Sequence, residues 1–221
     1  MDYPLGHTNG HIIVTVDEDN WLIDTGSPAS FGSRALKLDG KTFNLPAGLM
    51  GISVGFLAEN TGIPLGGLIG TDILNLFDVV FDVPKGLISF HKDAELPTGD
   101  DIPLILCMGV PVLEAQINGE ILTCFFDTGA QISYAPSRIL RPEDAIGPFQ
   151  DFYPTLGTFE TALHFADLVM GSGSFRVRCG VMPDFLAALM SFAGAEGIIG
   201  NELMLDQRVC YCPGKGKLIM G

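Results

Sequence analysis

Short apolar runs separated by polar or glycine-containing turns recur along this chain. Residues 11–16 are apolar and β-branched, four polar residues follow, and Trp21-Leu22-Ile23 is apolar again, a pattern typical of a β-hairpin. Asp-Gly at 39–40 and Asn-Gly at 118–119 each separate further short runs, as two-residue hairpin turns do. We expect an all-β chain with short helices, among them one near Thr71, whose hydroxyl could cap it, and one over residues 185–192.

One apolar-to-turn segment occurs twice. Residues 22–27 read Leu-Ile-Asp-Thr-Gly-Ser, and residues 125–130 read Phe-Phe-Asp-Thr-Gly-Ala. A single copy would be weak evidence of function, because an acidic residue before glycine commonly ends a strand at a turn. Each copy is, however, followed by two apolar residues and a glycine, at 68–70 and 198–200. The match continues in two further segments, 79–88 and 209–219. The chain is a tandem duplication whose repeated feature is a carboxylate on a tight turn.

This doubled pattern resembles the aspartic proteases, both pepsin-like and retropepsin-like, over nearly the whole chain. Pepsins are considerably longer, so the chain is most similar to a retropepsin-like fold duplicated and fused. The resemblance implies a two-lobed acid-protease fold, with barrel-like lobes related by a pseudo-twofold axis and an active site between them. We place the first lobe at residues 1–95, a polar and acidic linker at 96–102, and the second lobe at 103–221.

The resemblance makes Asp24 and Asp127 the catalytic pair of an aspartic endopeptidase. Two carboxylates that meet across a symmetry axis cannot both ionise cheaply, so they share one proton. The ionised member can take a proton from a water while the other donates to the substrate carbonyl oxygen. Supporting roles are implied for the rest of each turn and for the two glycine loops, namely Thr25, Gly26, Thr128, Gly129, Leu68, Ile69, Gly70, Ile198, Ile199 and Gly200.

Two positions in each lobe depart from the retropepsin pattern. Retropepsins commonly carry an Asp two residues after the glycine of the catalytic turn, and it pairs with an Arg after the downstream glycine. Here the first position is Pro28 or Gln131, and the second is Thr71 or Asn201. Both partners are missing together in each lobe, so no buried charge is left unpaired. Retroviral substrate specificity is therefore not carried over.

The lobes also differ in length between the turn and the glycine loop. Asp24 and Gly70 are 46 positions apart, whereas Asp127 and Gly200 are 73 apart. Aspartic proteases cover the aspartate pair with a mobile β-hairpin, the flap, and the extra residues, roughly 148–166, can form one. We predict a single flap in the second lobe with its tip within 153–159. The alternative is a surface insertion remote from the cleft. The residues expected to touch substrate are Tyr153, Pro154, Thr155, Leu156 and Gly157.

Composition narrows the partners. A formal net charge of −14 argues against nucleic acid, and no apolar run reaches the roughly 20 residues of a membrane helix. The first residues lack the pattern of a signal peptide. Five cysteines, all in the predicted second lobe, favour reduced thiols and a cytoplasmic location. We expect a monomer, since both half-sites are in one chain, with a peptide or protein substrate and neither cofactor nor metal.

Other candidate residues and functions have simpler explanations. The four histidines have no serine or cysteine nucleophile motif nearby, so structural or solvated roles are expected. Asp72 and Glu202 follow the two downstream glycines and are better read as helix-start carboxylates than as metal ligands. The rival function is a catalytically silent peptide-binding module of the same fold, although both Asp-Thr-Gly triplets are intact. A purely structural β-domain would not explain the duplicated glycines.

Overall fold

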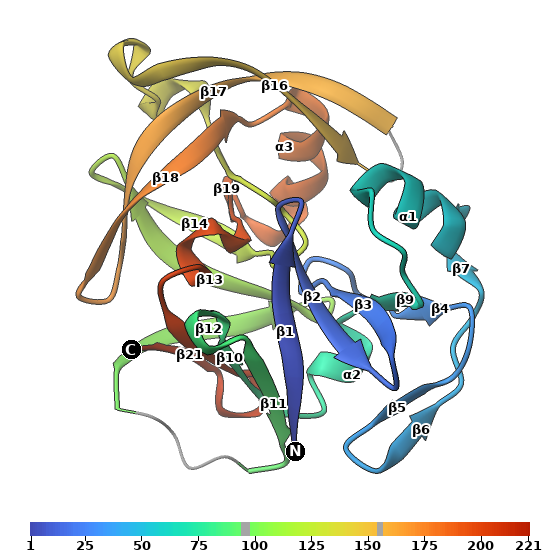
Figure 1. The fold of residues 1–221 in the computed structure, drawn as a ribbon. Coiled ribbons are helices and arrows are strands. Elements are labelled where there is room, and N and C mark those ends of the chain that lie inside the picture. The colour runs from blue at the N-terminus through green and yellow to red at the C-terminus, as the bar shows by residue number, and fades with distance from the viewer. Residues whose placement is uncertain (94–97, 154–156) are drawn as a thin grey trace.

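A six-stranded antiparallel sheet joins the two halves of the chain in the computed structural model, which describes residues 1–93, 98–153 and 157–221 (Figure 1). Its order is β1-β11-β10-β20-β21-β12, so each half of the chain supplies three strands that are neighbours in the sheet. The halves meet where Val79 pairs with Tyr211 and Phe81 pairs with Val209. The strands are β1 (Asp2–Thr8), β10 (Asp78–Asp82), β11 (Leu87–His91), β12 (Asp100–Cys107), β20 (Arg208–Cys212) and β21 (Lys217–Met220).

The first lobe is built on a sheet of order β1-β2-β3-β9-β4, in which β3 and β9 run parallel. Its strands beyond β1 are β2 (His11–Val16), β3 (Asp19–Ile23), β4 (Phe31–Gly32) and β9 (Gly67–Ile69). Two short hairpins and a helix lie between β4 and β9, namely β5 (Leu36–Leu38), β6 (Lys41–Phe43), β7 (Gly48–Leu49), β8 (Ile52–Ser53) and α1 (Val54–Thr61). Two further short helices are α2 (Thr71–Leu74) and η1 (Val83–Lys85).

The second lobe closes into a ring of strands, β13-β14-β19-β15-β18-β17 and back to β13. Strand β16 pairs with β17 outside this ring. The strands are β13 (Val110–Ile117), β14 (Glu120–Phe126), β15 (Ser133–Ala135), β16 (Ala145–Tyr153), β17 (Gly157–Met170), β18 (Gly173–Val181) and β19 (Gly197–Ile199). The short helices are η2 (Ser137–Ile139), η3 (Pro142–Asp144), α3 (Asp184–Met190), η4 (Ser191–Ala193), η5 (Asn201–Met204) and η6 (Pro213–Lys215).

The hairpins predicted from turn chemistry are present. Strands β2 and β3, β5 and β6, and β13 and β14 pair antiparallel. Asp39 and Asn118 have positive φ, as do the glycines after them, which is the backbone conformation that tight hairpin turns require. The helix expected over 185–192 is also found, as α3 and η4. The expected cap at Thr71 is wrong, because Gly70 precedes α2 and the Thr71 hydroxyl donates instead to the Ser27 carbonyl oxygen at 3.1 Å.

One apolar core runs through both lobes. It contains Ile23 and Phe126, which directly precede the two aspartates, together with Phe81 and Tyr211 from the joining sheet. The division into lobes and linker stays a prediction. Residues 94–97 lie outside the described part, and residues 100–102 of the expected linker belong to β12. No helix in the described residues is long and apolar enough to cross a membrane.

Candidate active site

Asp24 and Asp127 occupy equivalent places, each directly after a central strand. Strand β3 ends at Ile23 beside β9, and β14 ends at Phe126 beside β19, both pairs being parallel. The Asp24 N–H donates to the Ile69 carbonyl oxygen at 3.0 Å, and the Asp127 N–H donates to that of Ile199 at 2.9 Å. The glycine-loop residues Leu68, Ile69, Ile198 and Ile199 are all buried, so they serve as the packed backbone supports of the two turns.

Each aspartate is held by its own turn. Asp24 Oδ1 accepts from the N–H groups of Gly26 and Ser27, both at 2.9 Å. Asp127 Oδ1 accepts in the same way from Gly129 at 2.9 Å and from Ala130 at 3.2 Å. Because the same carboxylate oxygen is used in both lobes, the two side chains take matching orientations. The repeated Asp-Thr-Gly sequence therefore produces a repeated carboxylate geometry.

The two turns meet across the lobe boundary, where each glycine faces the aspartate of the other lobe. A Cβ atom built on Gly26 would lie 2.4 Å from Cγ of Asp127, and one built on Gly129 would lie 2.6 Å from Cγ of Asp24. No real Cβ could be accommodated at such distances. Glycine is needed here because the opposite carboxyl group packs directly against the backbone, a reason more specific than the turn conformation alone.

Thr25 and Thr128 exchange hydrogen bonds between the turns, as the resemblance implies. The Thr25 N–H donates to Oγ1 of Thr128 at 3.0 Å, and the Thr128 N–H donates to Oγ1 of Thr25 at 2.9 Å. Each hydroxyl also donates to a strand of the other lobe, Thr25 to the Phe126 carbonyl oxygen and Thr128 to that of Ile23. Both side chains are fully buried, so four hydrogen bonds without water fix the relative position of the two turns.

The ionisation of the two carboxyl groups is linked. Burial raises the pKa of Asp24 well above its usual value, and the charge of Asp127 and a hydrogen bond between the carboxyl groups raise it further. Burial also raises the pKa of Asp127, against the lowering effect of the Gly129 and Ala130 N–H groups. At mildly acidic pH the pair therefore keeps a proton that two separate aspartates would lose.

Behind each turn, a serine that sequence reasoning missed supports the downstream glycine. Ser30 Oγ accepts from the Gly70 N–H at 2.8 Å, and Ser133 Oγ accepts from the Gly200 N–H at 3.1 Å. Both serines are buried. Each lies six positions after its aspartate, so the repeat contained the signal that could have identified them. Gly70 and Gly200 themselves pack against backbone carbonyls, where a Cβ would come within 3 Å.

The two second-lobe positions that depart from the retropepsin pattern, Asn201 and Gln131, both contact the first lobe. Asn201 Nδ2 donates to the carbonyl oxygens of Gly10 at 2.9 Å and Thr128 at 3.1 Å, which ties the second-lobe turn to the β1–β2 hairpin of the first lobe. Gln131 contacts the same hairpin, with Nε2 3.2 Å from Nε2 of His11. Neutral contacts to backbone and histidine thus occupy the place of the absent ion pair.

The insertion of the second lobe forms the β16–β17 hairpin. Tyr153 and Gly157 pair at its described end. The predicted contacts Pro154, Thr155 and Leu156 lie outside the described residues. Burial raises the pKa of Tyr153, and the charges of Asp127 and Asp24 raise it further. The Phe152 ring lies 5.2 Å from that of Phe56 on α1, so the hairpin reaches across to the first lobe.

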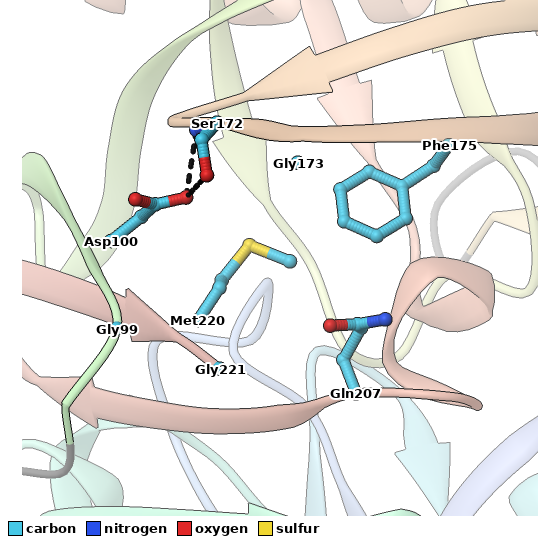
Figure 2. A pocket seen from close by; sticks show the side chains of 8 residues that line it. All are labelled: Gly99, Asp100, Ser172, Gly173, Phe175, Gln207, Met220 and Gly221. Atoms are coloured by element: carbon cyan, nitrogen blue, oxygen red, sulfur yellow. Dashed lines mark hydrogen bonds between the residues drawn. The ribbon is translucent and has the colours of Figure 1, made fainter.

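The remaining candidate groups have local structural partners. Asp72 accepts from the Ser30 hydroxyl at 2.5 Å, and Glu202 accepts from the Arg178 N–H at 2.7 Å and its Nε at 2.9 Å. All five cysteines are free thiols. Among residues 1–93, 98–153 and 157–221, no cluster of His, Cys, Asp or Glu could hold a metal ion. A surface hollow of about 310 Å³ lies beside Asp100 and Ser172, lined by neither catalytic turn (Figure 2).

Comparison with solved structures shows which fold this is. An aspartic proteinase from Irpex lacteus aligns over 100% of this chain and 96% of its own, at a TM-score of 0.59 and 11% identity. Basic 7S globulin from soybean aligns over 100% and 94%, at 0.55 and 11%. EIAV protease complexed with the inhibitor HBY-793 aligns over 44% and 86%, at 0.32 and 20%. Neither a protein-family model nor a curated protein matches the sequence.

The chain has the two-lobed fold of the aspartic proteases over its whole length. The two full-length neighbours carry different names, one a proteinase and the other a globulin. The shared fold therefore does not by itself establish catalysis, and function has to be argued from the site.

Proposed function

We propose that this protein is an aspartic endopeptidase, and that Asp24 and Asp127 activate a water between them for attack on a peptide carbonyl. The observation that carries the proposal is the reciprocal packing of two buried carboxyl groups, each held by its own turn and facing the other's glycine. The ionised member takes a proton from the water, and the protonated member donates to the carbonyl oxygen of the scissile bond. An extended peptide between the lobes is the expected substrate, and the chain acts as a monomer because it supplies both half-sites.

Cleavage of a mixed peptide library, followed by mass spectrometry between about pH 3 and pH 7, tests this proposal. The unmodified protein should cleave at acidic to mildly acidic pH, and cleavage should fall as the shared proton is lost. Asp24→Asn and Asp127→Asn should each abolish turnover while the fold is kept, because a carboxamide cannot accept the proton of the water. Asp206→Asn, at an exposed aspartate, is the matched control and should remain active. Ordinary turnover by Asp127→Asn would exclude the mechanism.

The fold likeness to a globulin keeps a second function in view, that of a catalytically silent peptide-binding module. Measuring peptide binding and peptide cleavage in parallel distinguishes this function from that of an endopeptidase. A silent module would hold peptides with equal affinity before and after the Asp→Asn changes and would release them intact. The endopeptidase should yield new amino termini that are absent from the Asp24→Asn reaction.

We also propose that the β16–β17 hairpin is the single flap of this enzyme. Support comes from the ring contact between Phe152 and Phe56, which carries the hairpin across to the first lobe, and from the effect of both aspartate charges on the pKa of Tyr153. Hydrogen exchange with and without pepstatin, an inhibitor that mimics the transition state, tests the assignment. Protection of residues 149–153 and 157–161 is expected. Protection confined to the β5–β6 hairpin of the first lobe would place the flap there instead.

A further inference from the structure

The outer part of the β16–β17 hairpin extends beyond the ring of the second lobe (Figure 1). Strand β17 pairs with β18 from Met170 back to Leu163, and from there to Gly157 its strand partner in the described residues is β16 alone. Within the part of the chain that the structure describes, β17 is also the one strand that pairs with β16. A two-stranded ribbon of this kind is marginally stable in water. Its position must therefore be set by side chains that connect it to the body of the lobe.

One face of this ribbon places the carboxyl group of Asp151 among aromatic side chains. Register places Asp151 opposite Phe159 and Tyr153 opposite Gly157, so these side chains share a face. The rings of Tyr153 and Phe159 each lie 5.7 Å from that of Phe185 on α3. Asp151 is partly buried among them and takes part in none of the ion pairs of the described residues. A carboxylate in such surroundings is costly unless it is hydrogen-bonded.

The hydrogen bond comes from Tyr134, whose hydroxyl donates to Oδ2 of Asp151, while the Phe152 N–H donates to Oδ1 at 2.8 Å. Tyr134 is a rigid donor. It is 2% exposed and lies in β15, and its backbone pairs with Gly180 and Ile198. Its ring rests directly on Gly180, where a Cβ would come within 2.7 Å of the ring. Tyr134 therefore connects the outer ribbon to the body of the lobe.

Fixing Asp151 also fixes the part of the hairpin that reaches the first lobe. Phe152 and Tyr153 follow Asp151 directly on the same strand, and Tyr153 shares its face. The Phe152 ring lies 5.2 Å from that of Phe56 on α1, across the lobe boundary. The charge of Asp127 raises the pKa of both Tyr134 and Tyr153. A loss of the Tyr134–Asp151 hydrogen bond would free the ribbon next to its contact with the first lobe.

We propose that Tyr134 and Asp151 are a positioning pair that holds the β16–β17 hairpin over Asp24 and Asp127. The inference rests on the proposed endopeptidase function and adds to it two residues that touch neither the water nor the scissile bond. What matters at position 151 is a side chain that hydrogen-bonds both the Tyr134 hydroxyl and the Phe152 N–H.

A double-mutant cycle tests the pair in the full-length protein. Tyr134→Phe and Asp151→Ala should each lower kcat/KM about tenfold or more, because each removes the same hydrogen bond to a charged group. The double variant should be no worse than either single one. Asp151→Asn should restore most of the activity, since its amide oxygen can accept from the Phe152 N–H while its NH2 group donates to the Tyr134 hydroxyl oxygen. Glu160→Ala removes the same charge from the exposed opposite face of the hairpin and should be neutral. Additive losses, or an Asp151→Asn variant as impaired as Asp151→Ala, would overturn the proposal.

A second measurement does not depend on turnover. Amide exchange of residues 149–153 and 157–161 is followed in the Asp24→Asn background, where self-cleavage cannot interfere. Tyr134→Phe and Asp151→Ala should speed this exchange several-fold without speeding exchange in β13 or β14, whereas Glu160→Ala should not. Unchanged exchange would refute the positioning role even if the enzyme cleaves peptides. If the unmodified protein cleaves nothing, the proposed function fails, and the exchange result still decides whether the pair holds the hairpin.

Discussion

The two lobes share what forms the aspartate pair and differ in what surrounds it. Both supply a hairpin, an Asp-Thr-Gly turn, a parallel strand, a glycine loop and three strands of the joining sheet. The first lobe then completes itself with short hairpins and α1 on an open sheet, whereas the second closes into a ring and extends the β16–β17 hairpin. The reciprocal contacts need two matching turns. A flap over the turns, by contrast, needs to come from one lobe alone, and we propose that the second lobe supplies it.

The largest loss of activity is expected when either of the two glycines that face the opposite aspartates is replaced. Gly26→Ala and Gly129→Ala should each lower kcat/KM about a hundredfold or more, because a displacement of a carboxyl group by about 1 Å is enough for such a loss. Gly214→Ala, at a glycine with nothing near its Cβ position, should be neutral. If the change in one lobe were tolerated and the other were not, the turns would not be equivalent.

The next largest effect is a loss of unfolding free energy, expected when the hydrogen bonds exchanged between Thr25 and Thr128 are removed. Thr25→Val leaves the Thr128 N–H and the Phe126 carbonyl unpartnered, which costs roughly 2–4 kcal/mol in unfolding free energy. Thr128→Val should cost about the same, and urea denaturation of the two variants measures both. Thr15→Val, which loses one partly buried hydrogen bond, is the control and should cost less. Unequal losses would show that one lobe carries the contact.

The raised aspartate pKa values predict a smaller effect with the opposite sign. A carboxyl group whose pKa is raised by folding contributes stability that is complete below the usual aspartate pKa and is lost as pH rises through the raised value. At neutral pH, Asp24→Asn and Asp127→Asn should therefore raise the melting temperature, by about 2–4 °C for each kcal/mol recovered. The gain should vanish near pH 3. A variant that is less stable than the parent at pH 7 would contradict this account.

The smallest effect is expected where the second-lobe hairpin touches the first lobe. Phe56→Ala removes one tilted ring contact to Phe152, and aromatic pairs contribute about 0.5–1.5 kcal/mol. KM for a peptide substrate should rise about two- to tenfold, with little change in kcat. Phe192→Ala, at a phenylalanine that is 61% exposed on η4, is the control and should leave KM unchanged.

The sequence predicted most where it repeats itself. The all-β class, the hairpins with Asn-Gly and Asp-Gly turns and the equivalence of Asp24 and Asp127 follow from short-range patterns that occur twice. Ser30 and Ser133 could have been found in the same way, since they share an offset from the aspartates.

Unrepeated contacts could not be predicted from the sequence. The Tyr134–Asp151 hydrogen bond joins two strands of one lobe, and nothing in the sequence around either residue specifies the other. The hydrogen bond from Asn201 to the Gly10 carbonyl oxygen depends on where the other lobe places that oxygen. The Thr71 cap failed because the chain enters α2 one residue earlier than expected, so Gly70 takes the N-cap position and Thr71 is the first helical residue. Each case depends on the fold already being assembled.

The pairing of β10 with β20 has a consequence for the order of events during synthesis and folding. The Asp24 turn emerges early from the ribosome, yet its hydrogen-bond partners at Phe126 and Thr128 and the strands at 208–220 emerge later. Contacts between residues so distant along the chain form slowly, because the intervening loop must be closed first. The two aspartates therefore meet only near the end of folding. A nascent chain that ends before residue 127 carries the Asp24 turn alone, so it lacks the aspartate pair that the proposed mechanism requires.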